Sequence, residues 1–408
     1  MVGFYYDFIP SYEVTEPFLH LVEQKMRQLV KAALAIEKME MESKNAKEYL
    51  DHLGHHYAIE ENRNYPTTTL FCIRDFLVGN RASCDFADPL APPFVKNTKE
   101  ISHFRLYSLQ PIGNKRFRIL GSVHEHDGDL KEECKLLTHY QKKNHLVDGE
   151  RADLFHREEK GWIWHPKGLV LKELCVERWN CAQREHNAHC IETVSLHDLS
   201  THKERPSRIK EEKISMHRSF FKKEKRSLPF RTAELFWEHS LPHEEILMEG
   251  LLHPAKGFRA LELCFVLRKE LLQECISSLQ FIDKILNMYP FGNHCTWVFS
   301  SGRKVKMIAE SEALLSALEM LKIPFVREER GEKTVTVEAR IQDRLGRGWQ
   351  VAYLSIDTSD EDVLVIERSS MGILERWIAL WVEHSLEDML EVLEPRVEKI
   401  LFAERKKI

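Results

Sequence analysis

Arg376 is the side chain in this sequence best suited to hold an anion. It lies in the segment GILERW (Gly372–Trp377), among apolar residues that share one helical stripe. A half-buried arginine needs an anionic partner, and its planar guanidinium matches the oxygens of a phosphate. The alternative is an ion pair with a carboxylate at the helix start, for which Glu375 is the nearest candidate. Arg376 taken alone leaves both interpretations open.

A strand, a turn and a helix must position Arg376. Val363–Ile366 is an apolar run of strand length, and the chain turns at Ser369–Gly372. From Ile373 the apolar period changes to that of a helix, which predicts one wide stripe facing a core. The stripe consists of Leu374, Trp377, Ile378 and Trp381. Arg376 is therefore expected at the start of a helix whose other face is buried.

A predicted hairpin precedes that strand. Arg340–Asp357 shows two strand-like runs around a tight turn at Leu345–Gly348. A hairpin followed by strand, turn and glycine-led helix resembles the third signature motif of the class II aminoacyl-tRNA synthetases. The words GRGWQ, GILERW and VEHS more narrowly resemble the end of a threonyl-tRNA synthetase catalytic domain. The resemblance implies an α+β fold, with an antiparallel sheet flanked by helices.

The resemblance also implies a domain layout. Residues 1–148, which begin with the word GFYYDF, resemble part of the family's second N-terminal, editing-type α+β domain. Residues 149–385, with the words WHPKG and LPFRTAEL, resemble the catalytic domain. Residues 386–408 are expected to form a helical tail without an anticodon-binding domain. In the editing-like part, Leu90 and Phe94 stand where the family has a reactive cysteine and a histidine, so editing hydrolysis is not expected.

Five residues make up the nucleotide site that the resemblance implies. Arg376 is the catalytic candidate, and the residues expected to bind ATP with Mg²⁺ are Arg376, Gly372, Gln350, His253 and Lys256. His253 or Lys256 would replace the family's second arginine. The family's R-x-E word, whose arginine holds the ATP α-phosphate, falls in Phe236–Glu249, which contains no arginine or lysine. Loss of one such contact costs about 3 kcal/mol of transition-state stabilisation.

The family's zinc ligands correspond to Ser215, Cys264 and Glu367 in this chain. Zinc prefers sulfur and nitrogen ligands, and a serine with one thiol and one carboxylate makes a poor set. No zinc is therefore expected, and these three residues are only weak candidates. Threonine recognition in the family also depends on polar residues that are mostly replaced here.

Composition limits the choice of partners. The chain has 408 residues and a net charge of −5, so any contact with a tRNA acceptor end must use a local basic patch, and DNA is not expected. No apolar run is long enough for a membrane span. Nine cysteines without regular spacing suggest reduced thiols in a cytoplasm.

The segment Cys190–Ser195 resembles the first class II motif, although Val194 replaces the proline of that motif. The resemblance predicts a homodimer or heterodimer through this surface.

The sequence supports two functional hypotheses. The first is a threonyl-tRNA synthetase-like protein that no longer forms an adenylate and serves as a binding or regulatory paralogue, associated with tRNA or with a synthetase. The second is an active ATP-dependent aminoacyl ligase with altered amino-acid or acceptor specificity. Retention of Arg376, Gly372 and Gln350 favours the second function. The cation-free segment Phe236–Glu249 favours the first.

Overall fold

The computed structural model describes most of the chain: residues 4–10, 18–53, 67–76, 84–88, 95–113, 116–158, 161–194, 206–224, 227–239, 250–254, 256–302, 308–330, 335–357 and 363–405. The chain divides into two compact units, Met1–His139 and Tyr140–Ile408. The domain limits expected after residues 148 and 385 stay a prediction. Leu90 and Phe94 lie outside the described residues.

The smaller unit contains two three-stranded sheets with helices beside them. One sheet has the strand order β1-β6-β5 and the other β2-β3-β4. The elements are β1 (Phe4–Phe8), α1 (Phe18–Ala32), β2 (Ile36–Glu42), α2 (Ser43–His52), β3 (Thr67–Phe76), β4 (Cys84–Asp88), η1 (Thr98–Glu100), β5 (His103–Gly113), β6 (Arg116–His124) and the start of α3 (Asp127–Lys142). A buried ion pair between Arg118 and Asp7, 2.6 Å apart, ties β6 to β1.

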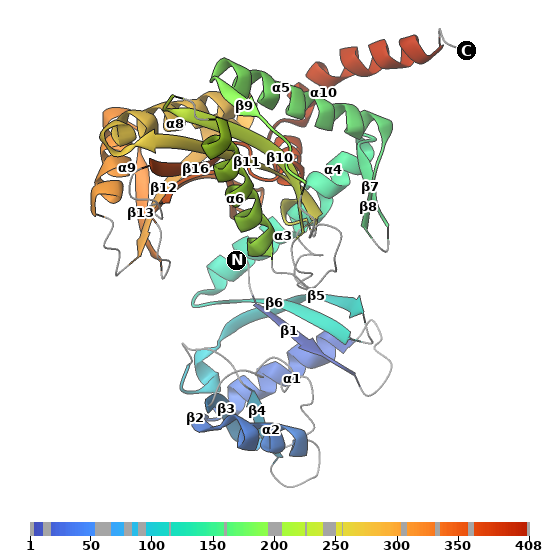
Figure 1. Cartoon of the computed structure of the whole chain (residues 1–408). Helices are drawn as coiled ribbons and strands as arrows, with labels where there is room; N and C mark the ends of the chain where they lie inside the picture. Colours follow the sequence, from blue (N-terminus) through green and yellow to red (C-terminus); the bar gives the residue numbers. More distant parts are fainter. Residues whose placement is uncertain are drawn as a thin grey trace. The chain divides into compact units, whose positions relative to one another are not determined.

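An eight-stranded sheet organises the larger unit, with the order β13-β12-β14-β15-β16-β11-β10-β9 (Figure 1). Its strands are β9 (Ala188–Cys190), β10 (Phe230–His239), β11 (Lys256–Leu267), β12 (Cys295–Gly302), β13 (Phe325–Arg330), β14 (Thr336–Gln342), β15 (Gly348–Asp357) and β16 (Val363–Ser369). Pairing is antiparallel except for the two outermost strands, which join in parallel. The antiparallel sheet with flanking helices that the sequence predicts is confirmed.

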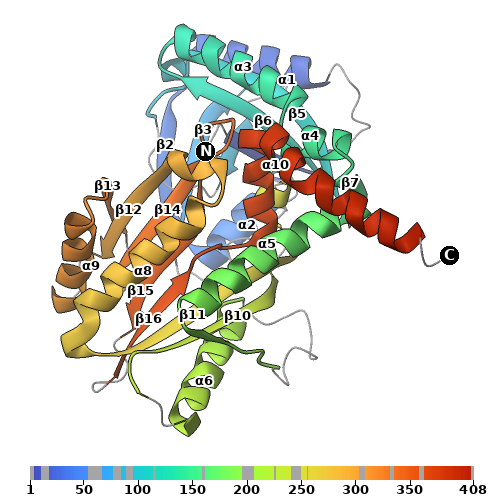
Figure 2. The same ribbon diagram turned by 90° about the horizontal axis from the view of Figure 1, so that it is seen from above.

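Helices pack on both faces of this sheet. Figure 2 looks onto the face that carries α5 (Pro166–Glu185), α8 (Leu271–Leu286) and α10 (Leu374–Arg405). On the opposite face lies α6 (Pro206–Glu224), which packs on β10 and β11. We call this opposite side of the sheet the α6 face. The remaining elements are α4 (His145–Arg151), β7 (Phe155–Glu158), β8 (Gly161–Trp164), η3 (Gly250–Leu252), η4 (Arg268–Glu270), η5 (Pro290–His294) and α9 (Ile308–Met320).

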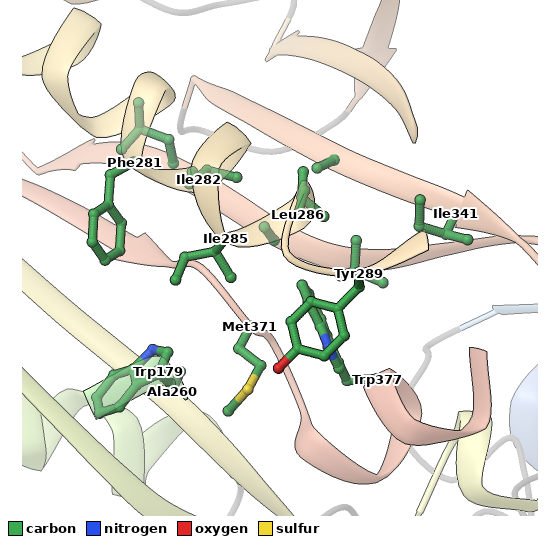
Figure 3. Packing of buried hydrophobic residues seen from close by; sticks show 14 of the residues in the cluster. Trp179, Ala260, Phe281, Ile282, Ile285, Leu286, Tyr289, Ile341, Met371 and Trp377 are labelled. Atoms are coloured by element: carbon green, nitrogen blue, oxygen red, sulfur yellow. The ribbon is translucent and has the colours of Figure 1, made fainter. Parts of the chain in front are cut away.

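The main hydrophobic core lies between the sheet and α5, α8 and α10. The predicted stripe of α10 is fully buried in it: Leu374, Trp377, Ile378 and Trp381 are each at most 1% exposed. The Tyr289 and Trp377 rings meet edge to face, with centroids 5.0 Å apart (Figure 3). Burying such aromatic rings contributes both apolar area and specific geometry. The start of α10 is therefore held rigidly.

Two local features differ from what residue types alone suggest. Serine commonly caps a helix, but Ser43 is the first residue of α2, and Glu42 holds the cap position without a side-chain bond. The Ser43 hydroxyl lies 2.8 Å from the Thr68 hydroxyl on β3, so a tertiary partner takes the oxygen that would have capped the helix. The strand predicted to end at Ile366 continues to Ser369. Among the described helices, none is long and apolar enough to cross a membrane.

A buried carboxylate anchors α10 to the N-terminal part of the larger unit. His145 Nδ1 of α4 lies 2.6 Å from Glu383 Oε1, and both side chains are buried. The backbone amides of His145 and Arg344 also donate to Glu383. Burial opposes ionisation of Glu383, but these hydrogen bonds and the positive charge of His145 outweigh it and lower the pKa of this carboxyl.

This arrangement predicts a loss of stability in acid. Because the folded pKa of Glu383 lies below that of the unfolded chain, its contribution is complete above the ordinary pKa of 4.5 and is lost as the pH falls through the folded value. Glu383→Gln should lower the free energy of unfolding at pH 7 by about 3 kcal/mol. It should also flatten the acid side of a urea-denaturation profile measured against pH. The exposed Glu391, which lies in α10 beyond its kink at Ser385, provides the matched control, Glu391→Gln. Equal pH profiles for the wild type and Glu383→Gln would contradict this account.

Candidate functional site

Glu262 is the hydrogen-bonding centre at the end of β16. This carboxylate is 2% exposed and pairs with the Arg368 guanidinium. It also accepts hydrogen bonds from the Ser370 amide (3.0 Å), from the Ser370 hydroxyl and from Trp179 Nε1 (3.1 Å). A buried carboxylate is stable only when its oxygens are satisfied in this way. Glu262 thus fixes the chain immediately before Gly372.

Gly372 then directs the chain into α10. Its φ of +57° lies in the left-handed region, which disfavours a side chain. A Cβ at this position would lie 2.7 Å from the carbonyl oxygen of Val351, so the turn passes directly against β15. The Gly372 carbonyl accepts a hydrogen bond of 3.0 Å from Ala260 on β11. The predicted turn therefore depends on glycine for both conformation and space.

Arg376 binds backbone carbonyls of this chain. Its Nε donates to the carbonyl of Leu252 at 2.6 Å, and its Nη1 donates to the carbonyl of Gln350 at 2.9 Å. The guanidinium also lies 5.3 Å from the Trp349 ring. Arg376 consequently joins η3 to β15. Glu375, the alternative partner, accepts hydrogen bonds from Lys172 at 2.7 Å and from the Phe258 amide at 2.8 Å.

The structure brings together four of the five residues predicted to bind nucleotide. Gly372, Gln350 and His253 lie around Arg376, but Gln350 contributes its backbone carbonyl. His253 follows Leu252 directly, and its ring is 6.4 Å from Trp349. Lys256 is separate, because its ammonium lies 4.9 Å from the ring of Trp237 at the outer end of the β10–β11 hairpin.

Cations on the α6 face are paired with carboxylates of the same face. Arg259 pairs with Glu238, and Arg340 binds both Glu328 (2.8 Å) and Glu338 (2.7 Å). Further pairs join α6 to the sheet: Lys210 with Glu367, Lys213 with Glu234 (3.0 Å) and Arg218 with Asp357 (2.7 Å). A phosphate would have to compete with an existing partner for each of these cations. The face is therefore largely self-neutralised.

The three positions matched to the family's zinc ligands do not converge. Cys264 is buried and opposes Ile366 in the core under α8, whereas Glu367 opposes Leu263 on the α6 face. Successive strand residues point to opposite faces, so Cys264 and Glu367 lie on different sides of the sheet. Ser215 is exposed on α6. Burial also raises the pKa of the Cys264 thiol to about 12, which disfavours the thiolate that binds zinc.

These residues therefore do not fit a zinc ion. Within the described parts of the chain, no group of three or more His, Cys, Asp or Glu side chains has the arrangement of a metal site. Each zinc ligand must lie about 2.0 to 2.3 Å from the ion, which three such dispersed groups cannot achieve.

Several residues that are important in this region were not identified from the sequence. Tyr353 on β15 donates its hydroxyl hydrogen bond to Glu367, and the Lys210 ammonium lies 5.2 Å from its ring. Burial, followed by the charge of Glu367, raises the pKa of Tyr353 far above its ordinary value, so the phenol remains a neutral donor. The spacing of Lys210, Lys213 and His217 on one helical face was the available signal.

A groove of about 400 Å³ lies beside α5, on the side of the sheet away from the α6 face. Trp237 and Phe258 provide its aromatic wall, with ring centroids 5.0 Å apart, and Trp237 remains 48% exposed. Residues of α5 complete the lining, including the basic Lys172 and Arg184 and the acidic Glu173 and Glu177. Charges of both signs thus surround an exposed tryptophan.

The role of Gly372 can be tested against a matched glycine. Gly346 has a φ of +76°, but a Cβ there would meet no atom within 4 Å. Gly346→Ala should therefore cost only the left-handed backbone penalty of about 1 to 2 kcal/mol. Gly372→Ala should cost that amount and a further 1 to 3 kcal/mol for the contact with Val351. Urea denaturation measures both, and equal losses would show that the close approach to β15 carries no energy.

Comparison with known proteins gives a consistent relationship. The chain is 24% identical over 447 aligned residues to the threonine–tRNA ligase of Clostridium acetobutylicum, covering 94% of this chain and 67% of the relative. The threonine–tRNA ligase of Vesicomyosocius okutanii is 26% identical, with the same coverage of both chains. No family model matches the chain.

A solved structure with low sequence identity to this chain has a similar fold. The RNA-binding domain of threonyl-tRNA synthetase from Cryptosporidium parvum superimposes with a TM-score of 0.52 at 17% identity. The match covers 60% of this chain and 72% of that structure. The chain is thus a homologue of the threonine–tRNA ligases and has the fold of the class II aminoacyl-tRNA synthetases.

Proposed function

We propose that this protein is a threonyl-tRNA synthetase-like paralogue that no longer forms an aminoacyl-adenylate. It acts in the cytoplasm as a binding or regulatory protein that associates with tRNA acceptor ends or with a synthetase. The observation that carries the proposal is the use of cations inside the fold. Arg376 donates to two backbone carbonyls, and Arg259 and Arg340 of the α6 face are paired with carboxylates.

The chemistry of adenylate formation explains why this use of cations matters. In this reaction a carboxylate would attack the α-phosphate of ATP in line and displace pyrophosphate, and arginines would stabilise the developing charge together with any Mg²⁺ that accompanies the nucleotide. Each lost contact of this kind costs about 3 kcal/mol, or two orders of magnitude in rate. The segment Phe236–Glu249 carries no replacement, since it contains neither lysine nor arginine. Loss of two contacts would leave little catalysis.

Amino-acid–dependent exchange of pyrophosphate with ATP tests the proposal. The wild-type chain should show no exchange above background with any proteinogenic amino acid. The threonine–tRNA ligase of Clostridium acetobutylicum, assayed in parallel with threonine, serves as the positive control. Exchange with one amino acid that is lost in a folded Arg376→Ala variant would establish the active ligase with altered specificity.

The same preparation should bind RNA. An acceptor-stem minihelix ending in unpaired nucleotides should bind saturably, with an affinity that falls as salt concentration rises. Whole tRNA should compete with the labelled minihelix. Absence of competition in a fluorescence-anisotropy titration would remove the acceptor end from the proposal and leave a protein partner.

The groove beside α5 supports association with a second protein chain, either another copy or a related synthetase. An exposed tryptophan in a groove resembles the aromatic anchors that dominate interfaces. In a two-fold interface the same patch meets itself, so it must be self-complementary. Glu173 and Glu177 on one side and Arg184 on the other meet this requirement along α5. Val194, in the segment that resembles the first class II motif, is 75% exposed.

Light scattering coupled to size-exclusion chromatography tests this surface. The wild-type chain should run as a dimer at micromolar concentration, and Trp237→Glu should shift it to the monomer by placing an unpaired charge in the contact. Met320→Glu, on another exposed apolar residue of the same unit, is the control and should leave the mass unchanged. A wild-type monomer that stays monomeric with added synthetase would contradict the proposal.

A further inference from the structure

We infer that Glu367 binds the ammonium of Lys210 as its cation instead of a zinc ion, so that an internal charge cluster ties α6 to the sheet. The cluster consists of Lys210, Glu367 and Tyr353. It is a structural substitution of one cation for another and does not depend on the proposed loss of adenylate formation. It also assigns a role to Glu367 that its position in the sequence does not reveal.

The Glu367 carboxylate already has two partners, and both contact its Oε1. It accepts the hydrogen bond of the Tyr353 hydroxyl and pairs with the Lys210 ammonium. The Glu367 side chain is 11% exposed and that of Lys210 is 31% exposed, so the pair is partly withdrawn from water. One ammonium neutralises one carboxylate here. A divalent metal bound at Glu367 would add two positive charges beside that ammonium, which like-charge repulsion opposes.

The rest of the proposed metal set offers no compensation. Cys264 points to the other side of the sheet, where its thiol lies 3.4 Å from Glu274. Ser215 is exposed, and its backbone carbonyl accepts a hydrogen bond from Ser219 one turn later along α6. Glu367 is thus the single one of the three that faces Lys210. Metal binding would need rearrangement of both the helix and the strand.

Lys210 is the first in a series of polar contacts along one face of α6. Lys213 and His217 both reach Glu234 on β10, at 3.0 Å and 2.9 Å. Arg218 reaches Asp357 on β15. The spacings of three, seven and eight residues place these side chains on one helical face. Lys210 extends this series to β16, so that α6 is attached to three strands without a metal.

Metal content and thermal unfolding together test the inference. Full-length wild-type protein produced with added zinc should contain substoichiometric zinc by mass spectrometry, and EDTA should leave its Tm unchanged. Lys210→Met and Glu367→Gln should each lower the Tm by several degrees. Lys222→Met, on an exposed lysine of the same helix, should not. Lys210→Arg, which keeps the charge, should retain most of the wild-type Tm.

A charge reversal separates the pair from the general polarity of the region. The double variant Lys210→Glu, Glu367→Lys should recover most of the Tm lost in the single variants, because the attraction is restored with its direction exchanged. One zinc per wild-type chain, or a Tm lowered by EDTA, would overturn the inference. Failure of the reversed pair to recover, with Lys210→Arg also unstable, would overturn it as well. None of these readouts depends on catalysis.

Discussion

Burial of carboxylates inside this fold requires cations to go with them. Glu262 shows the constraint most clearly, since it lies within the core at 2% exposure and collects Arg368, Ser370 and Trp179 around its oxygens. An unpaired carboxylate at that depth would cost several kcal/mol, so the arginine must stay. These contacts of Glu262 fix the C-terminal end of β16 and the turn that follows it. The start of α10 comes directly after this turn, so its position depends on the same contacts.

The same requirement explains why the site is so different from a phosphate-binding surface. Glu234, Glu238, Glu338 and Glu367 each hold a cation that could otherwise face a ligand. A pair of this kind stabilises the sheet and removes positive charge from the surface at once. Cations can face a substrate only where the neighbouring positions are apolar or neutral instead of carboxylates. On the α6 face of this chain, carboxylates lie beside the cations and pair with them.

Much of this architecture was predictable from the sequence, because periodicity reports burial directly. The stripe of α10, the hairpin at Gly346 and the glycine turn at Gly372 all follow from residue type and spacing. Hydrogen-bond partners were not predictable. Arg376 was expected to need an anion, but two carbonyls far away in sequence satisfy it, at Leu252 and Gln350. The separation of Cys264 from Glu367 depends on strand register, which one sequence does not specify.

The outer strands of the large sheet also determine how this molecule can meet others. β13, with the sequence FVREER, lies at one border and its last four residues are charged, and β9 at the other border is three residues long. Strands that are short or charged resist pairing with a foreign backbone. Stacking of copies border to border into fibres is thereby disfavoured. Contacts between molecules are therefore expected to use side chains instead of strand edges. Single substitutions can change the affinity of such side-chain contacts.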